Sequence, residues 1–368
     1  MNPQEVFCLN PDCHAKGQQG KGNIGIHSKE VKRYICHECK QTFSESKGGF
    51  FYRLQTDPKT VVLILTLLSY GCPQQAIVKG FGFDERTIKR WWKKAGEHCR
   101  AVHEAKVEQS QMELGQVQAD EIKVKVQGGF LWMALCMCIP TRLWLGGAVS
   151  PKRDKSLIKK LIGKLPRMAL AGPLLLAADG FSAYATVFRT TFRVPLHTGE
   201  LGRPRLLPRP ELAIVQVVKR RTAPLWEIRR LILQGTESLV TSLLERTQGG
   251  GVINTAFIER LNATFRQRLA PLARRTRSLA RQEQTITAGM YILGCFYNFC
   301  DTHQSLLLRS SDSPALQRTP AMASGLTESV WTPLQLFSLK IPPAPWTPPK
   351  RRRRPSARTR QLIEKWSL

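Results

Sequence analysis

The spacing of apolar residues changes along this chain and divides it into parts. From Pro58 to Val107 apolar residues recur at helical intervals, which predicts a helical segment. After Met112 short apolar runs alternate with amphipathic stretches, a pattern typical of an α/β domain. Past Asp301 the chain becomes rich in Ser, Pro and Arg, so we expect it to end in a mobile basic tail with a short helix at 359–366.

The α/β part is expected to open with an antiparallel meander and to continue with alternating helices and strands. The predicted elements, in chain order, are strands 117–126, 130–139 and 142–149, helix 154–165, strand 174–178, helix 181–192 and strand 193–197. Residues 201–251 do not fit this scheme. We therefore treat them as an insertion that carries a strand at 212–218 and a helix at 226–233.

Charge and length narrow the classes of function. The chain has 368 residues and a formal net charge of +29. This excess favours a polyanionic partner, because each cation that neutralises a phosphate releases a counterion. The longest apolar stretches, 61–68 and 130–139, are much shorter than the roughly 20 residues that cross a bilayer, and the first residues lack a signal-peptide pattern. We expect a cytoplasmic, nucleoid-associated protein of a prokaryote with no membrane partner.

Four cysteines near the N-terminus form two short-spaced pairs, Cys8 with Cys13 and Cys36 with Cys39. Four thiolates in this pattern suit the tetrahedral coordination of one structural Zn²⁺ ion. The residues 34–35 and 41–43 around the second pair are expected to form the short strands of a zinc ribbon. The alternative is a set of free cysteines in a disordered leader.

Residues 59–94 predict two short helices followed by a basic third helix, the arrangement of a helix-turn-helix. Asp84 is expected to cap the third helix, whose Ile88, Trp91 and Trp92 would pack inward. Its outer face presents the cations expected to contact DNA in the major groove: Arg86, Lys89, Arg90, Lys93 and Lys94. A packing module with a solvated basic face is the alternative interpretation.

Two aspartates stand at unusual places in the predicted strands. Side chains alternate along a strand, so Asp120 shares the apolar face of 117–126 with Ile122 and Val124, whereas Glu121 shares the other face with lysines. A carboxylate on an apolar face is costly unless it is paired or binds a metal, which favours Asp120 over Glu121. Asp179 follows the apolar run 174–178, at the strand end where α/β sheets place ligands.

A third acid lies on a predicted helix. Ile258, Leu261 and Phe265 form an apolar stripe that should face the sheet. Glu259, Asn262 and Arg266 fall at positions i, i+3 and i+7, so a carboxylate, an amide and a cation share the neighbouring polar face. A Glu–Arg pair on a solvated face is the alternative.

These motifs together resemble those of DDE transposases with an RNase H-like core, and most closely bacterial insertion-sequence transposases of the IS-one type. The likeness covers roughly residues 8–337. The four segments that carry it are the ribbon end Tyr34–Phe43, Asp179–Tyr184, Ile258–Arg266 with the arginines Arg274, Arg275 and Arg277, and Thr319–Thr327. In many such elements the N-terminal and catalytic parts are encoded separately, whereas here they form one chain.

The resemblance implies a multidomain chain. The expected parts are a zinc ribbon at 1–48, a helix-turn-helix at 55–108, an RNase H-like α/β domain with a mixed five-stranded sheet and helices at 112–305, and a C-terminal extension at 306–368. It also implies that Asp120, Asp179 and Glu259 bind two Mg²⁺ ions, or Mn²⁺, for phosphoryl transfer on DNA.

The implied partners are double-stranded DNA, as transposon inverted repeats and as target, and further copies of the chain in a homodimer or larger assembly. Asn262, Arg266 and the arginines at 274, 275 and 277 would hold the DNA backbone. Three alternatives stay open: a catalytically inactive regulator derived from a transposase, an RNase H-like nuclease that cuts without joining, and a recombinase using Tyr184 as nucleophile.

Overall fold

The computed structural model describes residues 1–196, 199, 202–222, 225–274, 276, 278–309, 314–348 and 356–366. Two compact units make up the chain. The terminal unit consists of residues 1–58 and 337–368, and the central unit of residues 59–336. The four-part division expected from the sequence stays a prediction. Among the described helices, none has the length and apolar character needed to cross a membrane.

The terminal unit is built on a small antiparallel sheet of β1 (Ile24–Ser28), β2 (Arg33–Cys36) and β3 (Thr42–Ser44). The strands predicted beside the second cysteine pair are therefore confirmed. A short 3₁₀ helix, Pro3–Glu5, precedes the sheet. The predicted C-terminal helix is α12 (Ala357–Trp366), and Trp366 Nε1 donates a hydrogen bond of 2.8 Å to the carbonyl of Asp12.

The central unit begins with three helices, α1 (Pro58–Ser69), α2 (Gln74–Phe81) and α3 (Glu85–His103). Asp84 caps α3 as predicted, because its Oδ1 accepts from the amide of Arg86 at 2.8 Å. Helix α3 runs nine residues beyond the expected end at 94 and continues into a π-helical turn, Glu104–Glu108. Its second half packs on α9 (Glu283–Cys295), with Gly96 directly against Ala288.

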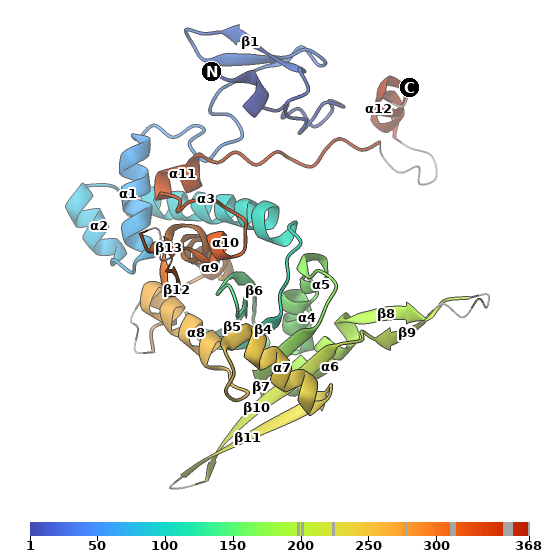
Figure 1. Cartoon of the computed structure of the whole chain (residues 1–368). Helices are drawn as coiled ribbons and strands as arrows, with labels where there is room; N and C mark the ends of the chain where they lie inside the picture. The colour runs from blue at the N-terminus through green and yellow to red at the C-terminus, as the bar shows by residue number, and fades with distance from the viewer. Residues whose placement is uncertain are drawn as a thin grey trace. The chain divides into compact units, whose positions relative to one another are not determined.

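A six-stranded mixed sheet forms the centre of this unit (Figure 1). Its strands are β4 (Gln116–Val126), β5 (Gly129–Cys138), β6 (Trp144–Ser150), β7 (Leu174–Asp179), β10 (Leu212–Thr222) and β11 (Leu225–Gln234), in the spatial order β11-β10-β7-β4-β5-β6. The meander β4-β5-β6 is antiparallel, as predicted, and β7 runs parallel to both β4 and β10. The apolar run at 174–178 lies inside the sheet and is fully buried.

Residues 201–251 differ most from expectation. The strand predicted at 212–218 is confirmed, but as β10 it pairs with β7 inside the main sheet, so this stretch is not an insertion outside the fold. The helix predicted at 226–233 is wrong: β11 pairs with β10 from Thr222↔Leu225 to Ile214↔Gln234. The hairpin adds two strands to the four predicted strands that lie in the main sheet, which therefore has six strands in place of the expected five. The short strand at 193–197 is β8 (Arg193–Leu196), which pairs with β9 (Arg205–Pro208) apart from the main sheet, and His197 lies outside the described residues.

Helices cover both faces of the sheet. One face contacts α4 (Lys155–Ile162) and α6 (Ser182–Thr191), and the other contacts α7 (Glu237–Gln248) and α8 (Ala256–Arg268). The apolar stripe predicted on α8 is confirmed, since Ile258, Leu261 and Phe265 are buried. The remaining elements are α5 (Leu165–Met168), the turns Ala270–Leu272 and Phe296–Cys300, β12 (His303–Leu308), β13 (Leu316–Arg318), α10 (Pro320–Ala323) and α11 (Pro333–Ser338).

Candidate metal and nucleic-acid site

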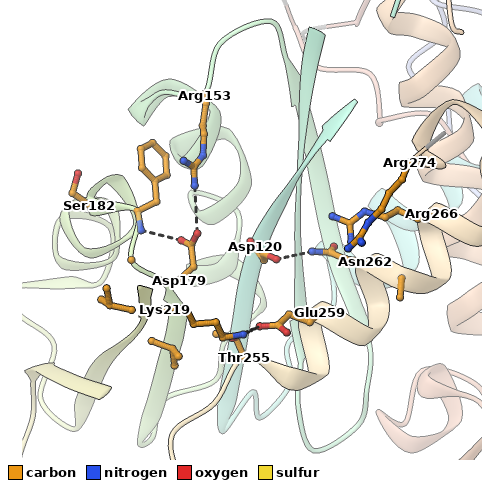
Figure 2. Close-up of a pocket in the computed structure, with 15 residues that line it drawn as sticks. Asp120, Arg153, Asp179, Ser182, Lys219, Thr255, Glu259, Asn262, Arg266 and Arg274 are labelled. Carbon is orange, nitrogen blue, oxygen red and sulfur yellow. Dashed lines mark hydrogen bonds and ion pairs between the residues drawn. The ribbon is translucent and has the colours of Figure 1, made fainter. Parts of the chain in front are cut away.

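A pocket opens beside Asp120, in the middle of β4, and the carboxyl end of β7, between β10 and α8 (Figure 2). Its lining contains all three acids singled out in the sequence, Asp120 from β4, Asp179 from β7 and Glu259 from α8. The cations and polar side chains that complete it are Arg153, Ser182, Lys219, Thr255, Asn262, Arg266 and Arg274. Residues as far apart as 120 and 274 in the sequence therefore share one site.

Asp120 points toward α8. Its Oδ2 accepts a 2.8 Å hydrogen bond from Nδ2 of Asn262, and its Oδ1 accepts one of 2.8 Å from the amide of Glu121. Burial, together with the negative charges of Glu121, Asp179 and Glu259, raises the pKa of Asp120 to about 7. The cost of ionising this carboxyl among other acids is the kind of cost that a bound cation removes.

Asp179 ends β7, and sheet register brings it beside Asp120. The parallel strands pair Ala119 with Ala178, so the aspartates that follow are neighbours. Asp179 Oδ1 accepts from the amide of Phe181 at 3.0 Å, and its Oδ2 lies 3.3 Å from Nη2 of Arg153. Single carboxylate oxygens of Asp120, Glu121 and Asp179 all lie within 4.8 Å of one another.

Glu259 lies in the first turn of α8 and lines the pocket without belonging to that close group of acids. Its Oε1 accepts from Nζ of Lys219 at 2.5 Å and from Oγ1 of Thr255 at 2.7 Å. Burial acts to raise the pKa of Glu259, but the hydrogen bonds from Lys219 and Thr255 outweigh it and hold this pKa below its usual value. Glu259 is therefore held as a carboxylate.

The predicted DNA-contacting residues of α8 lie at the same pocket. Asn262 is buried, and its Oδ1 has no hydrogen-bond partner among the described residues. Burial, and then the charge of Arg274, lowers the pKa of Arg266. Arg274 also lines the pocket, whereas Arg275 and Arg277 lie outside the described residues.

Four cationic or polar side chains of the pocket were not among the predicted site residues, namely Arg153, Ser182, Lys219 and Thr255. Arg153 follows β6 in the loop before α4, where Lys152 stands beside it and nothing in the sequence distinguishes the two. Lys219 was not predicted because residues 201–251 were expected to form an insertion outside the catalytic sheet. Thr255 directly precedes α8, and its position four residues before Glu259 was the one available signal.

The four predicted zinc ligands come together in the terminal unit. The Sγ atoms of Cys8 and Cys39 are 3.7 Å apart, those of Cys13 and Cys36 are 3.9 Å apart, and all four lie within 4.8 Å of one another. Such mutual distances suit four sulfurs around one tetrahedral ion with metal–sulfur bonds of about 2.3 Å. The sequence correctly predicted this cluster.

Helix α3 presents the predicted row of cations. Arg86, Lys89, Arg90 and Lys93 are exposed and Lys94 is half-buried, while Ile88 and Trp91 are buried and Trp92 is half-buried. Lys89 forms an ion pair of 2.5 Å with Glu85 one turn away. The sequence therefore predicted the orientation of this helix, and its contact with DNA stays a prediction.

Comparison with known proteins adds little to this geometry. No protein-family model matches the sequence, and no curated protein matches it either. Among solved structures, the chain is similar to a piggyBac transposase in a synaptic complex with hairpin DNA, studied by cryo-EM. The match has a TM-score of 0.32 and 9% sequence identity, and covers 80% of this chain and 72% of the other. A likeness this weak carries no argument, so any function must rest on the site itself.

Proposed function

We propose that this chain is a DDE transposase that cleaves DNA at the inverted repeats of its element and joins the ends to target DNA. The observation that carries the proposal is the convergence of Asp120, Asp179 and Glu259 in one cation-rimmed pocket, in a chain with a net charge of +29. Phosphodiester chemistry on a polyanion needs both features, acids for divalent ions and cations for the backbone.

The donor set of the pocket fits hard divalent cations. Carboxylate oxygens are the ligands that Mg²⁺ and Mn²⁺ prefer, and burial, followed by the charges of the neighbouring acids, raises the pKa of Asp120. Asp120, Asp179 and Glu259 would hold two ions. When bound, these ions would neutralise charge developing on the phosphate and lower the pKa of the attacking hydroxyl.

The other pocket residues have tasks that follow from their positions. Arg266 and Arg274 line the same pocket as the acids and offer their charge to the DNA backbone. Asn262 orients Asp120 through a 2.8 Å hydrogen bond, and Lys219 with Thr255 orients Glu259. Phosphoryl transfer needs a protein mainly to position the reacting groups and to stabilise charge, and these residues would do both.

Two further features support a transposase of the IS-one type. The sheet contains three antiparallel strands followed by two parallel ones, β4 to β6 with β7 and β10, as expected of an RNase H-like core. The zinc ribbon and helix α3 are the proposed readers of the inverted repeats. We further propose a homodimer or larger assembly, since two ends must be held together for joining.

The test is a cleavage and strand-transfer assay with labelled inverted-repeat ends, intact and pre-cut, in Mg²⁺. The wild-type chain should cut the intact ends and join the pre-cut ones, and Asp179→Asn should abolish both steps. Glu245→Gln, which changes an exposed acid on α7, is the matched control and should retain both. Binding without cutting or joining would favour the regulator, and cutting without joining would favour a nuclease.

A further inference from the structure

A fourth acid, Glu121, lies beside the proposed metal ligands but on the opposite face of β4 from Asp120. Its side chain is only 2% exposed. Its Oε1 forms a charge-assisted hydrogen bond and an ion pair with the guanidinium of Arg153, and its Oε2 accepts a hydrogen bond of 2.9 Å from the hydroxyl of Tyr184. Each carboxylate oxygen of Glu121 therefore already has one partner, a cation at Oε1 and a hydroxyl at Oε2.

Arg153 is shared between two acids. While it binds Glu121, its Nη2 also lies 3.3 Å from Oδ2 of Asp179. Its guanidinium carbon lies 4.3 Å from the ring centroid of Phe181 and 5.2 Å from that of Trp132. These aromatic faces favour a cation at this place, so the guanidinium is fixed at the edge of the pocket (Figure 2).

The position of Arg153 creates a conflict with metal binding. A cation at Asp179 competes with a divalent ion for the same carboxylate. The partner acid reduces that competition, because Glu121 balances the charge of Arg153 from the buried side. Tyr184, which is completely buried on α6, holds Glu121 in this orientation.

We propose that Glu121 is a positioning residue that anchors Arg153 and so keeps Asp179 available to the metal, and that Glu121 is not itself a metal ligand. The inference rests on the proposed function, because it assumes a divalent ion at Asp120 and Asp179. It gives Glu121, Arg153 and Tyr184 one common task, which is to balance charge behind the site.

The test measures Mn²⁺ affinity by electron paramagnetic resonance on the full-length chain without DNA, after the cysteine site is saturated with Zn²⁺. Glu121→Gln leaves the positive charge of Arg153 without its partner and should weaken Mn²⁺ binding about tenfold. A charge interaction of this size would shift a pKa by roughly one unit. Arg153→Met should strengthen binding by a similar factor. The double variant, neutral at both positions, should return to within about threefold of wild type, because the two effects oppose each other.

Each other outcome has a distinct meaning. A double variant that binds Mn²⁺ as weakly as Glu121→Gln alone would make Glu121 a ligand and overturn the inference. An unchanged Mn²⁺ affinity in Glu121→Gln, with only a lower Tm, would reduce the residue to a structural role and also overturn it. Tyr184→Phe, which keeps the ring, should weaken binding less than Glu121→Gln does. If the wild-type chain binds no Mn²⁺, or if Asp179→Asn binds it equally well, the metal site of the proposed function fails, and this inference with it.

Discussion

Asn262 donates a hydrogen bond of 2.8 Å to Asp120, although 142 residues separate them in the sequence. The bond joins helix α8 to the central strand β4. It fixes one oxygen of Asp120, the pocket acid whose pKa is raised to about 7. Asn262 is 1% exposed, so water cannot easily replace its amide. The orientation of Asp120 thus depends on the docking of α8.

The first prediction concerns this hydrogen bond. Asn262→Ala should lower the rate of DNA cleavage about 10- to 100-fold, since losing a buried hydrogen bond to a charged group costs about 1.5–3 kcal/mol. Asn262→Asp should be worse, because it places another negative charge against Asp120. Cleavage kinetics in saturating Mg²⁺ provide the measurement, with circular dichroism as the control for folding. Unchanged cleavage kinetics in Asn262→Ala would mean that this hydrogen bond does not contribute to catalysis.

The sequence predicted local features well and the long-range pairing poorly. Helical spacing placed Glu259 and Asn262 on α8 where both line the pocket, whereas the choice of Asp120 over Glu121 stays a prediction, because carboxylate oxygens of both lie within 4.8 Å of each other and of Asp179. The hairpin β10–β11 was missed because the conformation of β11 is decided by its pairing with β10 and not by local propensity. The stretch 226–233, whose apolar residues have mixed spacing, therefore forms a strand where a helix was expected. The ion pair of Lys219 with Glu259 depends on that strand and was therefore out of reach.

A second prediction tests the packing of α3 on α9. A Cβ at Gly96 would lie 2.4 Å from the Cβ of Ala288, far inside contact distance. Gly96→Ala should therefore lower the free energy of unfolding by about 1–3 kcal/mol, as overpacking does. Gly80→Ala in α2 is the matched control, since its added Cβ meets nothing within 4 Å, and it should stabilise slightly. Urea titrations of both variants measure the contrast, and equal stabilities would contradict this packing.

Zinc removal provides a third prediction. The purified chain should contain one equivalent of zinc, and Cys36→Ser should lose it, because three sulfurs and a hydroxyl bind Zn²⁺ much more weakly. The loss should unfold the small sheet of β1, β2 and β3, because the core beside it includes the ligands themselves. Atomic absorption measures the metal. Cys136→Ser, which removes a buried thiol of β5 far from the cluster in sequence, should keep its zinc.

A fourth prediction concerns the basic face of α3. If Arg90 and Lys93 contact phosphates, changing both to Ala should reduce the slope of log affinity against log salt by about two, since each contact contributes roughly 0.9. Lys160→Ala, an exposed cation on α4, should leave the slope unchanged. Fluorescence anisotropy with inverted-repeat DNA at several salt concentrations measures it. An unaltered slope in the double variant would remove α3 from the DNA interface.

The last prediction is a pH effect on stability. His103 is completely buried against Trp144, and burial, then the charge of Lys164, lowers its pKa to about 3. Glu108 lies 3.6 Å away but already accepts from Lys164 at 2.5 Å, so it does not hold a proton on the imidazole. In the unfolded chain the pKa returns to about 6.5.

The free energy of unfolding depends on pH because His103 binds a proton in the unfolded chain at a higher pH than in the folded chain. Above pH 6.5 neither state protonates His103, and its contribution to stability is fully present. Between pH 6.5 and pH 3 only the unfolded state takes up the proton, so the free energy of unfolding falls by up to about 1.4 kcal/mol per pH unit. His103→Phe should lose this share of the pH dependence, whereas His27→Asn, at an exposed position, should keep it. Urea titrations at pH 7, 6 and 5 compare the three proteins, and parallel slopes in wild type and His103→Phe would mean that the folded chain protonates His103.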